Sequence, residues 1–250
     1  MQQRVGEVTR NLEELKTRTA LEIALFEVWN DFRWYTRRKG EIEAEAVQEA
    51  LEVWLRLLAP FAPHICEELW SAAGKEHFIS LADWPRVDEG KVDVLAEERE
   101  NLLTDLIEDT LNVLRATKIS PTRVCYYTAN SWKWQVYRSI LEKSVQGEAK
   151  VNEVMKELAK DSSLRKNMKA VASFVPKVLK TLSKRPNERK ARLAKIEIAD
   201  EKEFIESALG FLEERFNAKV AVYGEEDQAR FDPKHRAALA VPGQPAIYIE

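Results

Sequence analysis

Two prolines, at positions 60 and 63, separate two stretches that have the apolar spacing of a helix. A proline inside a helix removes a backbone donor and clashes with the preceding turn, so Pro60 ends the helix expected over residues 41–58. Pro63 suits the first turn of the next helix, expected over residues 64–73, and Gly74 suits its end. The segment therefore predicts two helices joined by a tight turn.

An apolar stripe predicts one long helix before this pair, over residues 5–38. Five of its residues recur at intervals of three or four, namely Val5, Val8, Leu12, Leu15 and Thr19. A stripe of this kind buries one side of a helix against other helices. Gly40 ends the pattern. We therefore expect residues 1–90 to form a helical bundle.

The pattern changes after residue 90. A helix is expected over residues 92–117, which could belong to either part. Further helices are expected over 132–145 (which Asn130 and Ser131 could cap), 151–160 and 164–182, the last interrupted at Pro176. Asp200 and Glu203 resemble a capping box that opens a helix to about residue 217. Alternating residues predict strands over 123–128, 220–222 and 246–250. The fold class is therefore mainly α: a helical bundle, extending to residue 90 or 118, followed by a smaller α+β domain over residues 91–250.

Composition excludes several functional classes. The 39 basic and 42 acidic residues nearly cancel, so net charge does not point to a polyanion. Two cysteines and three scattered histidines do not form a zinc site of standard spacing, and they suit a reduced, cytoplasmic protein. No stretch has the apolar length of a membrane span. The first residues enter a helical pattern at once, which suggests a piece cut from a longer protein.

Catalytic motifs are missing. There is no glycine-rich phosphate loop, no nucleophile elbow and no paired metal-ligand motif. Residues 117–121 are faintly similar to the lysine-serine loop of class I synthetases, but they lack its second lysine and serine. His64 stands near Glu67 and Glu68, in a place where acidic residues complement a helix dipole. We expect no catalytic, cofactor or metal site in this chain.

The strongest electrostatic feature is a run of cations over residues 165–195. Eleven cations stand there against one acid, Glu188: Arg165, Lys166, Lys169, Lys177, Lys180, Lys184, Arg185, Arg189, Lys190, Arg192 and Lys195. By contrast, residues 89–109 hold eight acids and two cations. A long run of one sign favours binding of a polyanion, because phosphates are contacted with release of counterions. The alternative is plain surface charge.

A second mixed segment, residues 33–39, combines cations with rings that could stack on bases. The alternative is a helix end where Trp34 packs and the cations meet the helix dipole. Both can hold together.

The segment LAPFAPHICEELW, residues 58–70, resembles the signature of the helical anticodon-binding domain in leucyl, isoleucyl and valyl class I synthetases. Residues 78–85, FISLADWP, resemble the segment that follows in the same enzymes. The resemblance implies an architectural role, in which the prolines set the turn and four side chains fill the core: Phe61, Ile65, Leu69 and Trp70.

The remainder of the chain resembles the archaeal and eukaryotic type of leucyl-tRNA synthetase. This implies a tRNA-binding portion of a leucine–tRNA ligase, with catalytic and editing domains upstream in the same polypeptide, ATP and Mg in the parent enzyme but no cofactor here, and tRNA(Leu) as partner of a monomeric protein. The alternatives are the equivalent valyl or isoleucyl fragment, or a non-catalytic protein-interaction module on the same fold.

The family's C-terminal domain reaches the long variable arm of tRNA(Leu). If residues 246–250 alternate as a strand, Ile247 and Ile249 share one face, and Tyr248 and Glu250 the other. The carboxylates of Glu250 would accept from base amino groups but repel phosphate. The alternative is a frayed terminus. The candidate RNA-binding residues are Arg33, Arg37, Arg38, Lys133, Lys177, Lys180, Lys184, Arg185, Arg189, Ile249 and Glu250.

Overall fold

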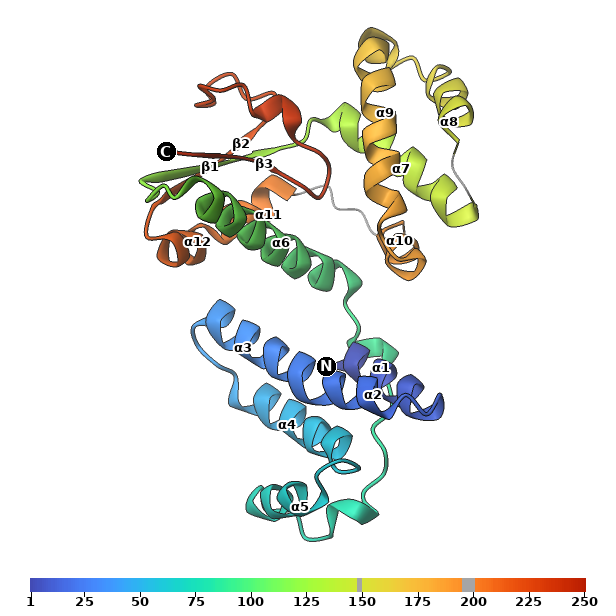
Figure 1. Cartoon of the computed structure of the whole chain (residues 1–250), viewed down its shortest axis with the longest axis vertical. Coiled ribbons are helices and arrows are strands. Elements are labelled where there is room, and N and C mark those ends of the chain that lie inside the picture. Colours follow the sequence, from blue (N-terminus) through green and yellow to red (C-terminus); the bar gives the residue numbers. More distant parts are fainter. Residues whose placement is uncertain (148–149, 195–200) are drawn as a thin grey trace. The chain divides into compact units, whose positions relative to one another are not determined.

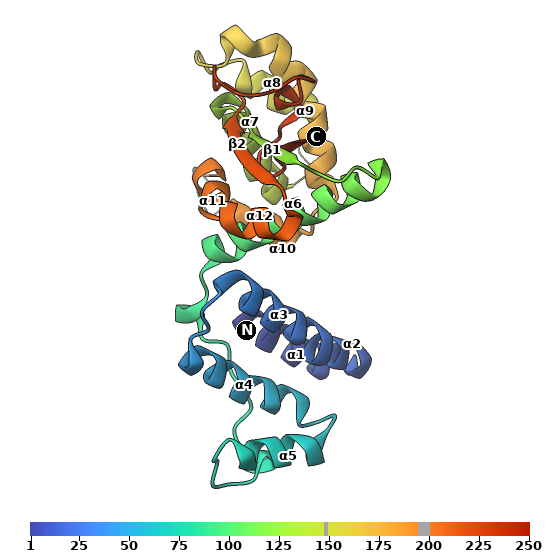
Figure 2. The ribbon, with the colours of Figure 1, turned by 90° about the vertical axis from the view of Figure 1, so that its left-hand side faces the viewer.

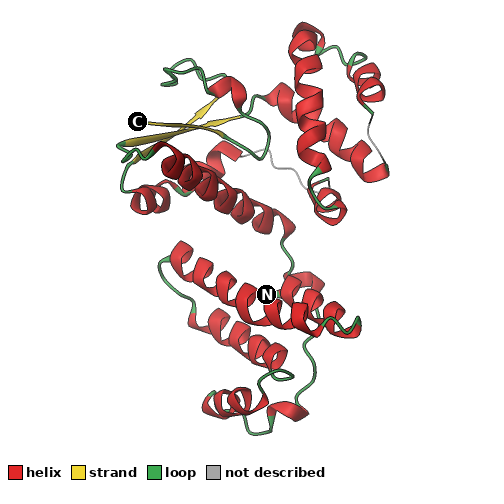
Figure 3. Ribbon diagram, in the orientation of Figure 1, coloured by secondary structure: helices red, strands yellow, loops and turns green. Residues whose placement is uncertain are grey.

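The computed structural model describes residues 1–147, 150–194 and 201–250, without the side chains of Lys166 and Glu188. The chain divides into two compact units, Met1–Asp93 and Val94–Glu250 (Figure 1). The described strands all lie in the second unit, and helices make up most of both (Figure 3). The predicted fold class, mainly α with a helical bundle followed by an α+β part, is confirmed, but the α+β unit is the longer of the two.

The first unit begins with a helical hairpin. Its elements are α1 (Gln2–Glu13), α2 (Thr17–Glu22), the π-helical turn η1 (Ile23–Glu27) and α3 (Val28–Lys39). Leu15 has a φ of 57° and is 84% exposed, and the Lys16 N–H donates to the carbonyl of Asn11 over 2.8 Å. The chain reverses there, so that Val5 and Val8 of α1 share a buried cluster with Ala20 and Ala24. The prediction of one helix over residues 5–38 is therefore wrong.

The proline segment folds as expected. It joins α4 (Ala44–Leu58) to α5 (Pro63–Ala72), and Pro63 is the first residue of α5. Trp70 is 8% exposed, and its indole N–H donates to the His77 carbonyl over 2.9 Å. Ile65 and Leu69, however, are 58% and 46% exposed, so their predicted place in the core is wrong. Trp70 is buried as predicted, and Cys66, which was not predicted to be in the core, is buried with it.

The loop after α5 is attached to the bundle at several points. It contains the short 3-10 turns η2 (Ile79–Leu81) and η3 (Glu89–Lys91). The carboxylate of Glu67 accepts from the Ile79 N–H over 3.0 Å. The indole N–H of Trp84 donates to the Thr9 hydroxyl over 2.8 Å. These bonds connect the second resemblance segment to both α5 and α1.

A three-stranded sheet organises the second unit. Its strands, β1 (Arg123–Thr128), β2 (Lys219–Gly224) and β3 (Ala246–Ile249), lie in the order β2-β1-β3, with β2 parallel and β3 antiparallel to β1. The helices α6 (Val94–Thr117), α11 (Glu201–Ser207) and α12 (Leu209–Phe216) cover one face (Figures 1 and 2). On that face the hydroxyls of Tyr126 and Thr110 are 2.8 Å apart. The segment after β2, with the turn η5 (Ala237–Leu239), covers the other face.

A group of helices extends from the end of β1. It comprises α7 (Ser131–Gln146), α8 (Val151–Leu158), the turn η4 (Arg165–Asn167), α9 (Met168–Ser183) and α10 (Asn187–Leu193). The side chain of Asn130 accepts from the Trp132 N–H over 3.2 Å, which confirms the predicted cap of α7. The expected interruption at Pro176 is wrong, because α9 continues through it.

Two further expectations concern the segment before β2. The predicted capping residue Asp200 lies outside the described residues. The single helix expected from there to about residue 217 is wrong, because α11 and α12 are separate helices that meet at Ala208. Asn217, with a φ of 49°, ends α12 in the left-handed conformation.

Candidate nucleic-acid interface

Three exposed cations of the basic run form a row along α9 and its C-terminal cap residue, Lys184. Lys177, Lys180 and Lys184 recur at intervals of three and four, and all three are exposed. The opposite side of the helix is fully buried, with Val171, Val175 and Val178 at 0% exposure. Its apolar face therefore sets the orientation of α9 and directs the lysines outward. Within the described residues none of the three ammonium groups has an ion-pair partner.

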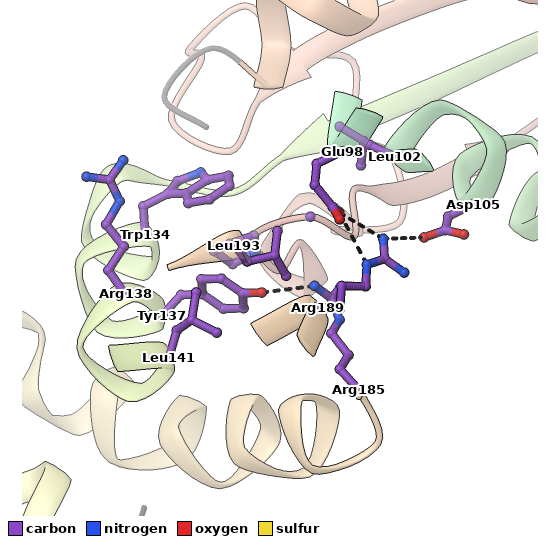
Figure 4. Close-up of a pocket in the computed structure, with 12 residues that line it drawn as sticks. Glu98, Leu102, Asp105, Trp134, Tyr137, Arg138, Leu141, Arg185, Arg189 and Leu193 are labelled. Carbon is purple, nitrogen blue, oxygen red and sulfur yellow. Dashed lines mark hydrogen bonds and ion pairs between the residues drawn. The ribbon is translucent and has the colours of Figure 1, made fainter. Parts of the chain in front are cut away.

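The two arginines of α10 differ from these lysines, because they pair with the acidic helix α6. The guanidinium of Arg189 lies 3.1 Å from the carboxylate of Glu98 and 3.7 Å from that of Asp105 (Figure 4). Arg192 lies 3.5 Å from Glu97. The acidic run and the basic run predicted from the sequence therefore meet each other in part. Some cations of the basic run are therefore engaged in ion pairs with α6, whereas within the described ranges the α9 lysines are not.

Arg185 lies between these two groups. Its guanidinium donates to the Tyr137 hydroxyl over 3.0 Å, at the edge of a hollow that Arg189 and Trp134 also line (Figure 4). Tyr137 is 4% exposed, and burial raises the pKa of its phenol. Arg185 is half-buried, so its side chain faces both this hollow and the lysine row.

A groove runs between α6 and the lysine row. Its α9 wall holds the three lysines, and its α6 wall holds Asp105, Glu108 and Asp109. Removal from water raises the pKa of the Asp105 carboxyl and that of the Asp109 carboxyl. No candidate from the sequence included these three acids, because only the folded chain brings them opposite the cations.

Lys133 is not on a surface. It is 4% exposed, and its ammonium donates to the carbonyls of Ala238 and Ala240 over 2.9 and 2.8 Å. It also lies 2.9 Å from the carboxylate of Glu225. Lys133 therefore joins α7 to the segment between β2 and β3. The prediction that Lys133 contacts RNA is therefore wrong, because its ammonium is buried and bonded within the protein.

The end of the chain belongs to the sheet. Ile249 pairs with Val124, and the Glu250 N–H donates to the Arg123 carbonyl over 3.0 Å. The Glu250 carboxylate lies 3.3 Å from the guanidinium of Arg123. The expected alternation holds, because Tyr248 pairs with Cys125 and packs on one face of the sheet, whereas Ile249 pairs with the neighbouring residue on the other. The last residues are therefore hydrogen-bonded into the sheet.

Cations and aromatic rings cluster around Tyr248, and the sequence did not predict this cluster. The guanidinium of Arg123 lies 5.1 Å from the centre of the Phe231 ring, and the ammonium of Lys234 lies 5.9 Å from that of Tyr248. The Phe231 and Tyr248 rings are 6.0 Å apart, edge to face. The signal in the sequence is faint, since these residues come from three separate segments.

The cations at the end of α3 lie in the first unit. Arg33 and Arg37 are exposed, whereas Arg38 is half-buried. At the beginning of the same helix Trp29, which is 51% exposed, stacks on Trp54 of α4 with ring centres 6.2 Å apart. Arg33 and Arg37 stay candidate RNA contacts of the first unit, because both side chains are exposed.

Other kinds of site find little support. Among the described residues, no cluster of three or more His, Cys, Asp or Glu side chains could hold a metal ion. Cys66 and Cys125 are buried, and burial raises the pKa of both thiols. No helix in the described ranges is long and apolar enough to cross a membrane.

Comparison with known proteins gives consistent matches. Residues 1–126 match the family described as the anticodon-binding domain of tRNA ligase. The leucine–tRNA ligase of Methanococcoides burtonii is 36% identical over 252 residues, which cover 100% of this chain and 26% of that protein. Those of Pyrococcus abyssi and Pyrococcus horikoshii are 36% and 37% identical, covering 97% and 98% of this chain and 24% of each protein.

The chain thus spans about a quarter of the length of the curated relatives it matches. The family match includes the proline turn, both resemblance segments and the whole first unit, and it extends through α6 into β1. The chain belongs to the family of anticodon-binding domains of tRNA ligases.

Proposed function

We propose that this chain is the tRNA-binding part of a leucine–tRNA ligase. In this proposal the chain holds tRNA(Leu), so that the catalytic and editing domains of the parent polypeptide receive the acceptor end for ATP-dependent leucylation. ATP and Mg would be bound outside this chain. The parent enzyme would act as a monomer in the cytoplasm. The names of the relatives support the choice of the leucine enzyme.

One structural observation carries the RNA-binding part of the proposal. The three lysines on α9 stand exposed on one side of a helix whose other side is locked into the core. Cations at this spacing can contact successive phosphates, which positions a nucleic acid without reading its sequence. Arg189 is left out of the proposed phosphate-binding surface, because its guanidinium already pairs with Glu98.

The test is the salt dependence of RNA binding. Replacing Lys177, Lys180 and Lys184 by Ala should weaken binding to tRNA of any sequence. It should also reduce the slope of log K against log[salt] by about 2–3, since each phosphate contact contributes about 0.7–0.9. Binding would be followed by fluorescence anisotropy from low to moderate salt.

A matched control removes three exposed lysines that do not line the groove: Lys118, Lys156 and Lys160. This variant has the same net charge as the first, so it should keep most of the slope. Equal slopes for the two variants would refute the α9 surface. Competition among purified tRNAs for leucine, valine and isoleucine would separate the proposed parent from the valyl and isoleucyl alternatives. Binding no stronger than that of an unrelated RNA would favour a protein-interaction module instead.

For specificity we propose the end of the chain. The Glu250 side chain is 36% exposed and lies beside Arg123 and the ring of Tyr248. A carboxylate in this position can accept from base amino groups, and the neighbouring rings and cations suit unpaired bases. The long variable arm of tRNA(Leu) would present such bases.

A further inference from the structure

The groove between α6 and α9 has two walls of opposite charge. It encloses about 620 Å³, which lies within the range of about 300–1,000 Å³ usual for ligand sites. The floor is formed by the turn that precedes β3, at Gly243, Gln244 and Pro245. One wall is the lysine row of α9, and the other is the carboxylate row of α6.

Among the described residues, the lysine row does not pair with the carboxylates of α6, and on the α6 wall only Asp105 has a cation partner, the guanidinium of Arg189 at 3.7 Å. In the part of the chain that the structure describes, Lys177, Lys180 and Lys184 make no ion pair, and neither Glu108 nor Asp109 has a hydrogen-bond or ion-pair partner. Opposite charges that line one groove without touching leave room for a ligand between them. That ligand must present negative charge on one side and hydrogen-bond donors on the other.

An unpaired nucleotide has this chemistry. Its phosphate is the anion, and its base carries amino and imino donors on the Watson–Crick edge, which is free only outside a duplex. Guanine is the best match, because its N1–H and amino group can both donate to one carboxylate. The outer surface of a duplex presents phosphates along its length, and these would meet repulsion from the α6 wall.

A smaller hollow of about 30 Å³, which has room for about one water molecule, adjoins the groove. It shares Asp105, Arg185, Arg189 and Gly243 with the groove, and Trp134 and Tyr137 line its far end (Figure 4).

We propose that this groove binds an unpaired RNA segment, with phosphates along the α9 lysines and base donors against the α6 carboxylates. Glu108 and Asp109 are then specificity-determining residues that select unpaired guanosine and disfavour duplex backbone. The proposal rests on the proposed RNA-binding function. It adds selectivity for bases, which cations that contact phosphates do not provide.

The experiment compares three RNA probes of equal length on the whole chain. One is a hairpin with two guanosines in a uridine loop, the second has inosine at these two places, and the third is a blunt duplex. Inosine lacks only the 2-amino donor. The unaltered chain should bind the guanosine loop about tenfold more tightly than the inosine loop, as expected for one paired contact.

The variant Glu108→Gln with Asp109→Asn should lose this preference and bind the duplex several-fold more tightly, because the repulsion is removed. The control, Glu214→Gln with Glu226→Gln, changes two exposed carboxylates outside the groove and should retain the preference. All four positions are exposed, so unfolding midpoints should stay together and serve as a check on folding.

Two outcomes would overturn the proposal. The first is equal affinity of the unaltered chain for the guanosine and inosine loops. The second is a preference that survives in the Glu108→Gln, Asp109→Asn variant. If the salt slope still depends on the α9 lysines, either result would refute the role of Glu108 and Asp109 in specificity but not the proposed function. Failure of every probe to bind would refute both.

Discussion

Glu201, the first residue of α11, is a carboxyl group enclosed by the second unit. It is 2% exposed, and its Oε1 accepts from the Gly243 N–H over 3.0 Å. Burial raises its pKa from 4.5 to about 8, although hydrogen bonds from the backbone of Gly243 and Ala129 act in the opposite direction. The folded chain therefore keeps this carboxyl protonated at neutral pH.

The raised pKa makes stability depend on pH with a definite sign. Below pH 4.5 Glu201 is neutral in both the folded and the unfolded chain, so its full contribution is present. Between pH 4.5 and about 8 the unfolded chain releases a proton that the folded chain retains, so the free energy of unfolding falls as pH rises. Each pH unit costs about 1.4 kcal/mol, which amounts to roughly 3 kcal/mol at pH 7.

Replacing Glu201 by Gln should remove this dependence. The amide keeps an oxygen for the Gly243 N–H and cannot ionise, so the variant should be more stable at pH 7 by up to about 3 kcal/mol. The gain should shrink to less than about 1 kcal/mol at pH 5. Urea unfolding at half-unit steps from pH 5 to 8 would measure the difference between the two chains.

The control is Glu203→Gln, an exposed carboxyl in the same helix. It should leave the pH profile of the unaltered chain unchanged. A difference between Glu201→Gln and the unaltered chain that stays constant from pH 5 to 8 would refute the reasoning. It would show that the Glu201 carboxyl ionises in the folded chain as it does in the unfolded one.

Three other variants follow from contacts in the structure. Lys133→Met should cost about 3 kcal/mol in urea unfolding, because the half-buried Glu225 loses its cation; adding Glu225→Gln should recover part of this, and no recovery would mean that the pair is not coupled. Trp70→Phe should cost about 2 kcal/mol, since it removes the 2.9 Å bond to a backbone carbonyl and some core volume; a thermal midpoint equal to that of the unaltered chain would count against it. Glu250→Gln keeps the backbone bonds of the terminus and removes an exposed ion pair worth less than about 1 kcal/mol. Stability should hardly change, whereas filter binding should show a smaller preference for tRNA(Leu) over tRNAs with a short variable arm; an unchanged preference would exclude Glu250 from specificity.

Features with local causes could be predicted from the sequence. The start of α5 at Pro63 follows from the missing N–H and restricted φ of proline, and the cap of α7 by Asn130 follows from one side-chain oxygen near one free N–H. Strand β1 was predicted with its observed bounds, because its residues are β-branched and aromatic and helices flank it. Each of these depends on neighbours within a few positions.

The reversal at Leu15 could not be predicted in this way. Apolar spacing reports which side of a helix is buried, but it does not report whether the axis continues in the same direction. Here the stripe runs through the turn, and Leu15 takes a left-handed conformation with its side chain in solvent. The reversal is stabilised by packing of Val5 and Val8 against Ala20 and Ala24, and these contacts form only when the hairpin closes.

The candidate site shows the same division. Composition along the chain located a basic run and an acidic run, because charge is a property of each residue. Which charges are available depends on contacts between distant segments. Arg189 is engaged by Glu98, 91 residues away, and Lys133 is enclosed by carbonyls more than 100 residues away. Coulombic pairing falls off with distance in space, so only the folded chain separates the free lysines of α9 from cations that hold the fold together.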